Sequence, residues 1–302
     1  MKHPHFTAVG RMLGIGALLL LSGCTLEVLS PKGEIGAQEK TLFLTATYLM
    51  LIVVVPVIAM TLYFAWKYRA SNTKADYSPT WSHSTGIEVV VWTIPCIIVA
   101  ILAVITYKSS HALDPYKPIE SSVQPINIDV VSMDWKWLFI YPDYDIATVN
   151  EIVFPVDAPL NFRITSSAMM NSFFIPQLGS QIYSMAGMET KLHLIANEPG
   201  TYAGISANYS GSGFSGMRFK AIATSNEDFQ AWVTKARASN NPLTPESYQA
   251  LLVPSESVPV SYYSSAPTGM FDNIIHNTMS KIAGVDPASC TPTSQNLIAG
   301  YN

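Results

Sequence analysis

The chain has 302 residues, of which 49% are hydrophobic and only 13% are charged. Soluble domains usually carry about 25% charged residues, so this composition argues against an ordinary soluble enzyme and favours membrane segments. The formal net charge is −4 and no basic stripe is interleaved with aromatic residues, so we expect no nucleic acid partner.

The N-terminus has the layout of an exported, lipid-anchored protein. Lys2 and Arg11 precede an apolar run that ends in LSGC at Cys24. A basic start followed by an apolar stretch is typical of a signal peptide. The small-residue pair before the cysteine resembles the bacterial lipobox, so we expect residues 1–23 to be removed and Cys24 to carry the lipid. The alternative is an ordinary signal peptide followed by an incidental cysteine.

Two long apolar runs predict transmembrane helices at residues 41–67 and 87–108. Each exceeds the about 20 residues needed to cross a bilayer core. A buried core helix is the alternative, but Pro56 and Pro95 fall within the runs, and membrane helices tolerate proline better than soluble ones. We therefore predict a membrane hairpin that follows a periplasmic N-terminal segment at residues 24–40.

The loop at residues 68–86 sets the expected orientation. Lys67, Arg69 and Lys74 cluster beside the first run, and an excess of positive charge marks cytoplasmic loops. We expect a multi-pass lipoprotein of the bacterial inner membrane with both termini in the periplasm.

After a linker at residues 109–124, short segments of alternating polar and apolar residues predict an all-β sandwich at residues 125–225. Residues 226–285 favour helices, with caps at Ser225 or Asn226 and at Thr244. Residues 286–302 are expected to be disordered.

One C-terminal segment predicts an amphipathic helix with a continuous apolar face. That face needs a cover, either the β-domain or a neighbouring protein. Its members are Met270, Phe271, Ile274, Ile275, Met279 and Ile282.

Residues 211–216 match the string G-x-G-x-x-G of dinucleotide sites. That fingerprint needs a following helix and an acidic residue about 20 positions on. Here a strand pattern follows and no acidic residue stands at that distance, so we reject a dinucleotide site.

The same loop resembles the copper loop of cytochrome c oxidase subunit II, C-x-E-x-C-G-x-x-H-x-x-M, which holds a two-copper centre in a cupredoxin fold together with an upstream histidine. The spacing is kept here, but five of the six ligand positions are changed. The matching residues are Asn171, Ser206, Asn208, Ser210, Phe214 and the retained Met217.

These replacements remove the donors that copper requires. Two soft thiolates bridge such a centre, whereas serine hydroxyls stay protonated and a phenyl ring donates nothing. The remaining histidines, His83, His111, His193 and His276, are not spaced as ligand pairs. We expect a vacated copper site and no metal or other cofactor in this chain.

The wider resemblance is to subunit II of the cytochrome bo-type ubiquinol oxidases. It rests on the lipobox, both apolar runs, MDWKWLFIYP, NSFFIPQLGSQIYSMAGM and the C-terminal region, from about Cys24 to about residue 285. It implies a membrane-anchored cupredoxin-like sandwich with C-terminal helices, in a proton-pumping complex that oxidises ubiquinol and reduces oxygen to water.

The resemblance also implies the partners. Haems and one copper would belong to a catalytic haem–copper subunit I, accompanied by further small membrane subunits and lipid, with no cytochrome c. The alternatives are a cytochrome c oxidase subunit, which the lost ligands oppose, and a stand-alone lipoprotein whose cupredoxin-like domain binds a partner.

The resemblance also implies positions of interest for three further residues. Glu88 matches an acid at the mouth of a proton-uptake channel, although an interfacial carboxylate without function is an equal alternative. Trp135 and Trp137 match the aromatic strand on the electron path of copper-bearing relatives. Without an acceptor behind them, we expect packing or subunit contact.

Overall fold

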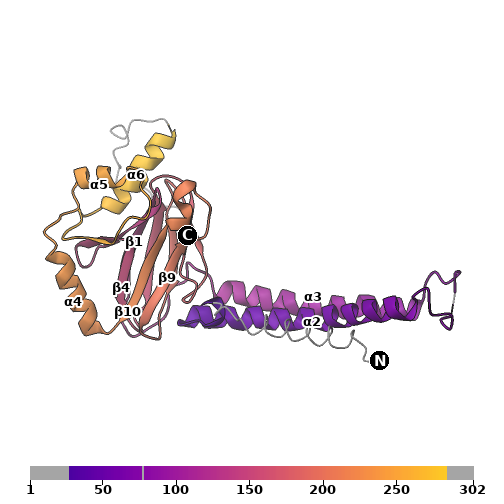
Figure 1. Cartoon of the computed structure of the whole chain (residues 1–302). Helices are drawn as coiled ribbons and strands as arrows, with labels where there is room; N and C mark the ends of the chain where they lie inside the picture. Colours follow the sequence, from indigo (N-terminus) through magenta and orange to yellow (C-terminus); the bar gives the residue numbers. More distant parts are fainter. Residues whose placement is uncertain (1–26, 77, 284–302) are drawn as a thin grey trace, which may run out of the picture.

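The computed structural model describes residues 27–76 and 78–283. A helical hairpin projects from a β-sandwich, and further helices lie against the sandwich on its other sides (Figure 1). Cys24, the signal peptide at residues 1–23 and the expected tail at residues 286–302 lie outside the described residues.

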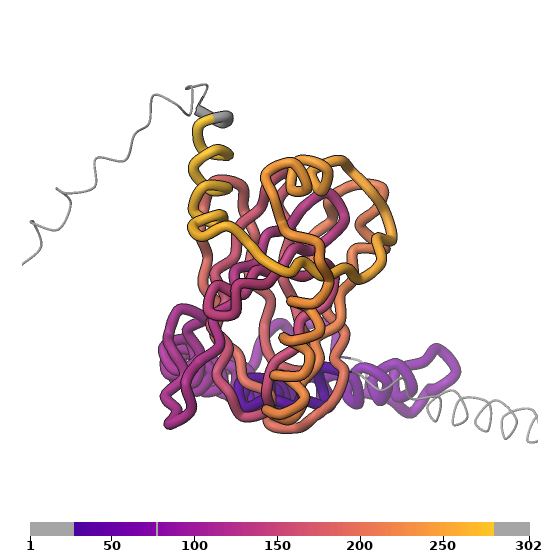
Figure 2. Tube along the Cα trace, turned by 90° about the vertical axis from the view of Figure 1, so that its left-hand side faces the viewer, coloured from indigo at the N-terminus to yellow at the C-terminus, as the bar shows by residue number. Residues whose placement is uncertain are grey.

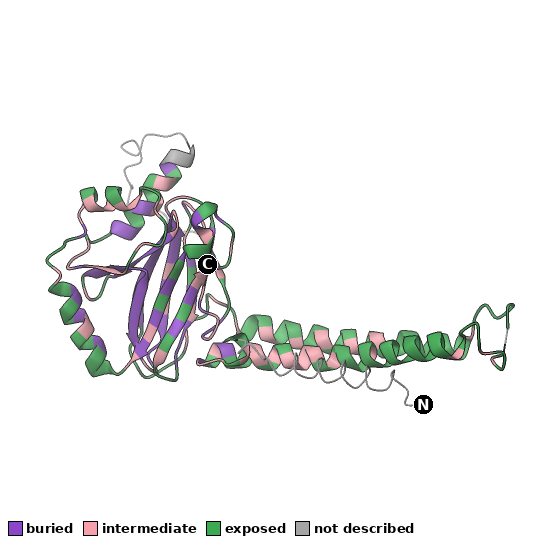
Figure 3. Cartoon of the chain, in the orientation of Figure 1, coloured by how far each residue is buried: buried purple, intermediate pink, exposed green. Residues whose placement is uncertain are grey.

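The hairpin consists of α2 (Glu34–Lys67) and α3 (Thr85–Ala112), after a short helical turn η1 (Glu27–Leu29). The two helices run side by side, and both are long and apolar enough to cross a membrane (Figure 1). Most of their side chains are exposed in this single chain, as Figure 3 shows by the green and pink of the hairpin. α2 begins at Glu34, before the apolar run that predicted a helix from residue 41. The sequence pattern missed these first turns because their residues are mostly polar.

Close backbone contacts fix the start of α2 to the β-domain. The Lys32 amide donates to the Gln177 carbonyl at 2.7 Å, and the Asn197 amide donates to the Lys32 carbonyl at 2.8 Å. A Cβ on Gly33 would lie 2.1 Å from the Ile195 carbonyl oxygen, so this approach requires glycine. The hairpin is therefore joined rigidly to the domain.

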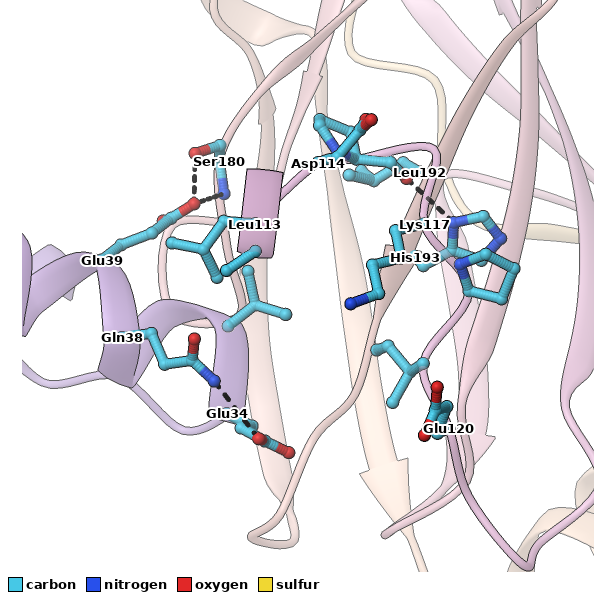
Figure 4. Close-up of a pocket in the computed structure, with 15 residues that line it drawn as sticks. Glu34, Gln38, Glu39, Leu113, Asp114, Lys117, Glu120, Ser180, Leu192 and His193 are labelled. Atoms are coloured by element: carbon cyan, nitrogen blue, oxygen red, sulfur yellow. Dashed lines mark hydrogen bonds between the residues drawn. The ribbon is translucent and has the colours of Figure 1, made fainter. Parts of the chain in front are cut away.

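A pocket of about 360 Å³ lies beside this junction, between the ends of both helices and the β-domain (Figure 4). Glu39 of α2 accepts hydrogen bonds from the hydroxyl and the amide of Ser180. On the opposite wall, His193 Nδ1 lies 2.8 Å from the Pro115 carbonyl oxygen, so this nitrogen carries the proton. These bonds connect both helices of the hairpin to the sandwich.

The sandwich has two sheets, with strand orders β11-β3-β2-β1-β5-β8 and β4-β10-β9-β6-β7. The main apolar core fills the space between them, and Figure 3 shows much of these strands in purple, with green and pink bands where residues face outward. The strands are β1 (Ile126–Met133), β2 (Lys136–Tyr141), β3 (Ile146–Val149), β4 (Glu151–Pro155), β5 (Leu160–Ser166), β6 (Asn171–Phe174), β7 (Ile182–Ser184), β8 (Thr190–Leu194), β9 (Gly200–Ser206), β10 (Arg218–Thr224) and β11 (Ser261–Tyr263).

The segment VNEIVFP, which alternates like one strand, instead supplies the end of β3 and all of β4. Asn150 separates them with a φ of 59°, a left-handed conformation that asparagine tolerates better than most residues. Its side chain accepts from the Trp137 amide at 2.9 Å and donates to the Val258 carbonyl at 2.8 Å. These bonds hold the chain where it passes between the sheets.

Residues 226–283 contain the expected helices and also the strand β11, which pairs with β3 and extends the six-stranded sheet. The helices are α4 (Asn226–Arg237), α5 (Pro245–Leu251) and α6 (Met270–Ala283). Figure 2 shows this part of the chain, in orange and yellow, wrapped over the sandwich. Ser225 and Thr244 cap α4 and α5 through bonds from the amides of Asp228 and Ser247.

The β-domain itself covers the first half of the apolar face of α6. Met270, Phe271 and Ile274 are buried in a second cluster together with Leu138 and Ile140 of β2. Met279, further along the helix, is 52% exposed. The six-stranded sheet is therefore packed on both faces.

A charged cluster also links α6 to the sheet. Arg163 of β5 binds both carboxylate oxygens of Asp129 on β1, at 2.8 and 3.0 Å. The same guanidinium reaches Asp272 of α6 at 3.3 Å and lies 4.5 Å from the ring centroid of Phe271. Because the Asp129 carboxylate is buried, it depends on this arginine for compensation.

We predict that Arg163→Met lowers the free energy of unfolding by about 2 kcal/mol, less than for a fully buried pair because water reaches part of Arg163. In a protein of this size, the melting temperature should fall by about 4–8 °C. Tryptophan fluorescence of the purified full-length protein measures the change. Lys191→Met is the control, because Lys191 is exposed and its ion pair with Glu189 is long, at 3.6 Å. Equal shifts of the melting temperature in both variants would contradict the role of Arg163.

Candidate functional site

The loop at residues 207–217, which contains four of the six predicted copper-ligand positions, joins β9 to β10 and contains the short helical turn η2 (Ser212–Gly216). The Ser206 amide donates to the Met217 carbonyl at 3.3 Å, which closes the base of the loop. Within it, the amide of Phe214 bonds the Gly211 carbonyl at 3.2 Å. Gly211 has a φ of 109°, a conformation that favours glycine.

The structure brings three of the predicted positions together. β6, which carries Asn171, pairs with β9, which ends at Ser206. The Ser206 hydroxyl lies 2.9 Å from Asn171 Oδ1, and Asn208 Nδ2 donates to the Met170 carbonyl at 3.1 Å. Hydrogen bonds thus join the loop to β6 through three of the positions at which the sequence predicts vacated copper ligands.

The other three positions face different surroundings. Met217 is 1% exposed and belongs to the main core. Phe214 packs edge-on against Tyr209, with ring centroids 5.7 Å apart. Ser210 is buried, and its hydroxyl has no hydrogen-bond partner among the described residues.

The donor set at this loop does not fit a copper centre. The polar groups of Asn171 and Ser206 are bonded to each other, and Phe214 has no donor atom. The thioether of Met217 is a weak ligand without thiolate or imidazole beside it. Across residues 27–76 and 78–283, no group of three or more His, Cys, Asp or Glu side chains is placed to hold a metal ion.

The two tryptophans occupy different places although they are two residues apart. Trp137 is fully buried in the main core and meets Phe173 and Phe219 edge-on, at centroid distances of 5.5 and 5.7 Å. Trp135 packs against the loop, and its indole Nε1 donates to the Ser210 carbonyl at 3.0 Å. One side chain fills the core, and the other supports the loop.

Glu88 lies in the first turn of α3, at the end of the hairpin that is distant from the β-domain (Figure 1). Its side chain is exposed in the single chain. The helix N-terminus favours a negative charge there. The loop site and Glu88 are therefore separated by the length of the hairpin.

The four histidines among the residues that the structure describes also stay apart from the loop. His111 Nδ1 lies 2.8 Å from the Tyr107 carbonyl oxygen at the end of α3, and His193 bonds Pro115 at the hairpin junction. His83 is in the connection between α2 and α3, and His276 is on α6. None of them takes the place of the missing imidazole ligands.

Sequence reasoning missed the contact between the loop and residues 253–258. In this contact, Ser212 of the loop donates to Glu256 at 3.0 Å. Residues 253–258 are in turn held to β2, where the buried Lys136 donates to the Val253 carbonyl at 2.8 Å. Burial lowers the pKa of the Lys136 ammonium, an effect that nearby Asp134 opposes. No spacing pattern connects residues so distant in the chain, so a single sequence carried no signal for this contact.

Two family models match the part of the chain that follows the hairpin. The family model of the cytochrome c oxidase subunit II periplasmic domain matches residues 145–223, and that of the COX aromatic-rich motif matches residues 237–281. Among solved structures, the periplasmic domain of subunit II of the cytochrome oxidase of Bradyrhizobium japonicum is similar, with 19% identity and a TM-score of 0.38, over 40% of this chain and 98% of that chain.

Two curated relatives match most of the chain. The cytochrome bo(3) ubiquinol oxidase subunit 2 of Pseudomonas aeruginosa is 62% identical, over 88% of this chain and 80% of its own length. The ubiquinol oxidase subunit 2 of Acetobacter aceti is 53% identical, over 91% of this chain and 90% of its own. The chain therefore belongs to the ubiquinol oxidase subunit 2 family.

Proposed function

We propose that this chain is the non-redox subunit II of a proton-pumping ubiquinol oxidase that reduces oxygen to water. The observation that carries the proposal is the loop at residues 207–217, which keeps the spacing of a copper loop while hydrogen bonds and packing occupy the ligand positions. Electrons from ubiquinol, a membrane-soluble donor, need no copper in a periplasmic domain.

The same proposal assigns the cofactors to a partner. Haems and one copper would reside in a haem–copper subunit I, with further small membrane subunits and lipid around the hairpin. Support comes from the long apolar surface that α2 and α3 leave exposed in the single chain. In this arrangement the β-domain covers the periplasmic side of subunit I, and cytochrome c is not a partner.

The proposed topology places the chain in the bacterial inner membrane with both termini in the periplasm. Cys24 would bear a lipid, and residues 68–86 would face the cytoplasm because Lys67, Arg69 and Lys74 cluster there. Glu88, in the first turn of α3, would then lie at the cytoplasmic surface and serve in proton uptake.

Purification of the native membrane complex through this chain tests the main proposal. We expect a haem-containing partner to co-purify, and oxygen uptake to be driven by ubiquinol and not by reduced cytochrome c. Uptake driven by cytochrome c would contradict the proposal. Purification without any haem protein would instead favour a stand-alone lipoprotein.

Restoring the donors tests whether the loop is a vacated copper site. We predict that a variant with Asn171→His, Ser206→Cys, Asn208→Glu, Ser210→Cys and Phe214→His binds two copper ions with a thiolate-to-copper absorption band, whereas the native protein binds none. The physical reason is that the loop keeps the spacing of the ligands, and that Asn171 and Met217 already lie against Ser206 at its base. Metal analysis and EPR measure the outcome.

The control for this experiment carries the two introduced cysteines, whereas Phe214 and Asn171 stay unchanged. It should bind copper weakly, since the imidazole ligands are missing. Stoichiometric copper in the native protein, or none in the fully restored and folded variant, would contradict the vacated-site proposal.

We predict that Glu88→Ala slows ubiquinol oxidation several-fold without loss of assembly, because a proton-collecting carboxylate is removed from the surface of the membrane. Asp76→Ala is the matched control, since Asp76 is an acidic residue of the connection between α2 and α3. Oxygen uptake by complexes with equal haem content measures the effect. An unchanged rate in Glu88→Ala would leave Glu88 as a carboxylate without function.

A further inference from the structure

The loop at residues 207–217 has few contacts within itself, among them the bond from the Phe214 amide to the Gly211 carbonyl and the packing of Phe214 on Tyr209. It contains three glycines, and these leave the unfolded chain many conformations that an ordered loop must give up. Serine hydroxyls are poor ligands for copper and a phenyl ring has no donor atom, so these side chains are not suited to being fixed by a metal. Some other part of the chain must therefore order it.

Trp135 supports the loop from one side. Its indole bonds the Ser210 carbonyl at 3.0 Å, and its ring lies directly against two of the glycines. A Cβ would lie 3.2 Å from the Trp135 ring at Gly211 and 2.4 Å at Gly213. Larger residues at these positions would push the loop away from the ring.

Residues 253–258, which we call the strap, contact the loop from the other side. Ser212 donates to Glu256 Oε1 at 3.0 Å. A Cβ on Gly213 would lie 2.8 Å from Glu256 Cγ, and one on Gly216 would lie 3.3 Å from Ser257 Oγ. Gly213 is therefore held between Trp135 and Glu256.

The strap is itself anchored to the sandwich at both ends. Lys136 Nζ donates to the Val253 carbonyl at 2.8 Å and to Ser255 Oγ at 2.6 Å. At the other end, Asn150 Nδ2 donates to the Val258 carbonyl at 2.8 Å. Lys136 is 1% exposed. Because a buried ammonium without acceptors is energetically costly, breaking these bonds would destabilise the fold.

We propose that the strap is a clamp that locks the metal-free loop in a single conformation, pressing it against Trp135. Two left-handed residues other than glycine stand at the contact, Trp135 with a φ of 63° and Ser257 with a φ of 52°. Such conformations persist where surrounding contacts impose them. The clamp thereby takes the ordering role that bound metal has in a metalloprotein loop.

Hydrogen exchange by mass spectrometry on the purified complex tests the clamp. Glu256→Ala removes the bond to Ser212 and the contact with Gly213, so peptides covering residues 207–217 should exchange about threefold to tenfold faster. Ser212→Ala should speed the same peptides. The double variant should add little to Glu256→Ala, because both changes break one shared bond.

Val253→Ala is the matched control within the strap, because its side chain is exposed and only its carbonyl bonds Lys136. It should leave exchange of the loop unchanged. Since Glu256 and Ser212 are both exposed, neither variant endangers folding.

A second variant tests the anchor. Lys136→Met should speed exchange of both the strap and the loop, while peptides from β1 and β5 stay protected. Loop exchange that is unchanged in Glu256→Ala, or a strap released by Lys136→Met while the loop stays protected, would overturn the clamp. Neither result bears on ubiquinol oxidation, so the proposed function is tested separately.

Discussion

Strand β2 is buried on both of its faces, and the architecture of the β-domain depends on that constraint. All six residues of Lys136–Tyr141 are buried. Trp137, Phe139 and Tyr141 face the core between the sheets, whereas Leu138 and Ile140 lie under the C-terminal helices. A sheet with two apolar faces must be covered twice, so the C-terminal region is an integral layer of the domain.

This second layer also explains how a loop without metal donors remains ordered. The chain that covers the outer face of β2 continues past the loop, and Lys136, on the same strand, fixes it there. At this loop, packing and hydrogen bonds connect segments that are distant in the sequence. The conformation of the loop thus depends on the same C-terminal segment that covers the outer face of the sheet.

Much of the fold follows from local pattern. β1, β5, β8, β9 and β10 lie in segments that alternate polar and apolar residues. β2 does not alternate, because neither of its faces meets water, and β11 lies in a region whose composition favours helices. The boundary between β3 and β4 escaped prediction because Asn150 interrupts one continuous strand pattern with a left-handed residue. The first half of the α6 face, which needed a cover, receives it from the β-domain.

By itself, the sequence determined the two apolar helices, the caps at Ser225 and Thr244, and the absence of cysteine and histidine from the loop, since each depends on residue type over a short stretch. Only the tertiary structure decided that Arg163 joins Asp129 to Asp272, that Trp135 and Glu256 enclose Gly213, and that Lys136 holds Val253. These contacts connect residues far apart in the chain. The path of the backbone through the fold determines which of these residues meet, and a local sequence pattern carries no information about that path.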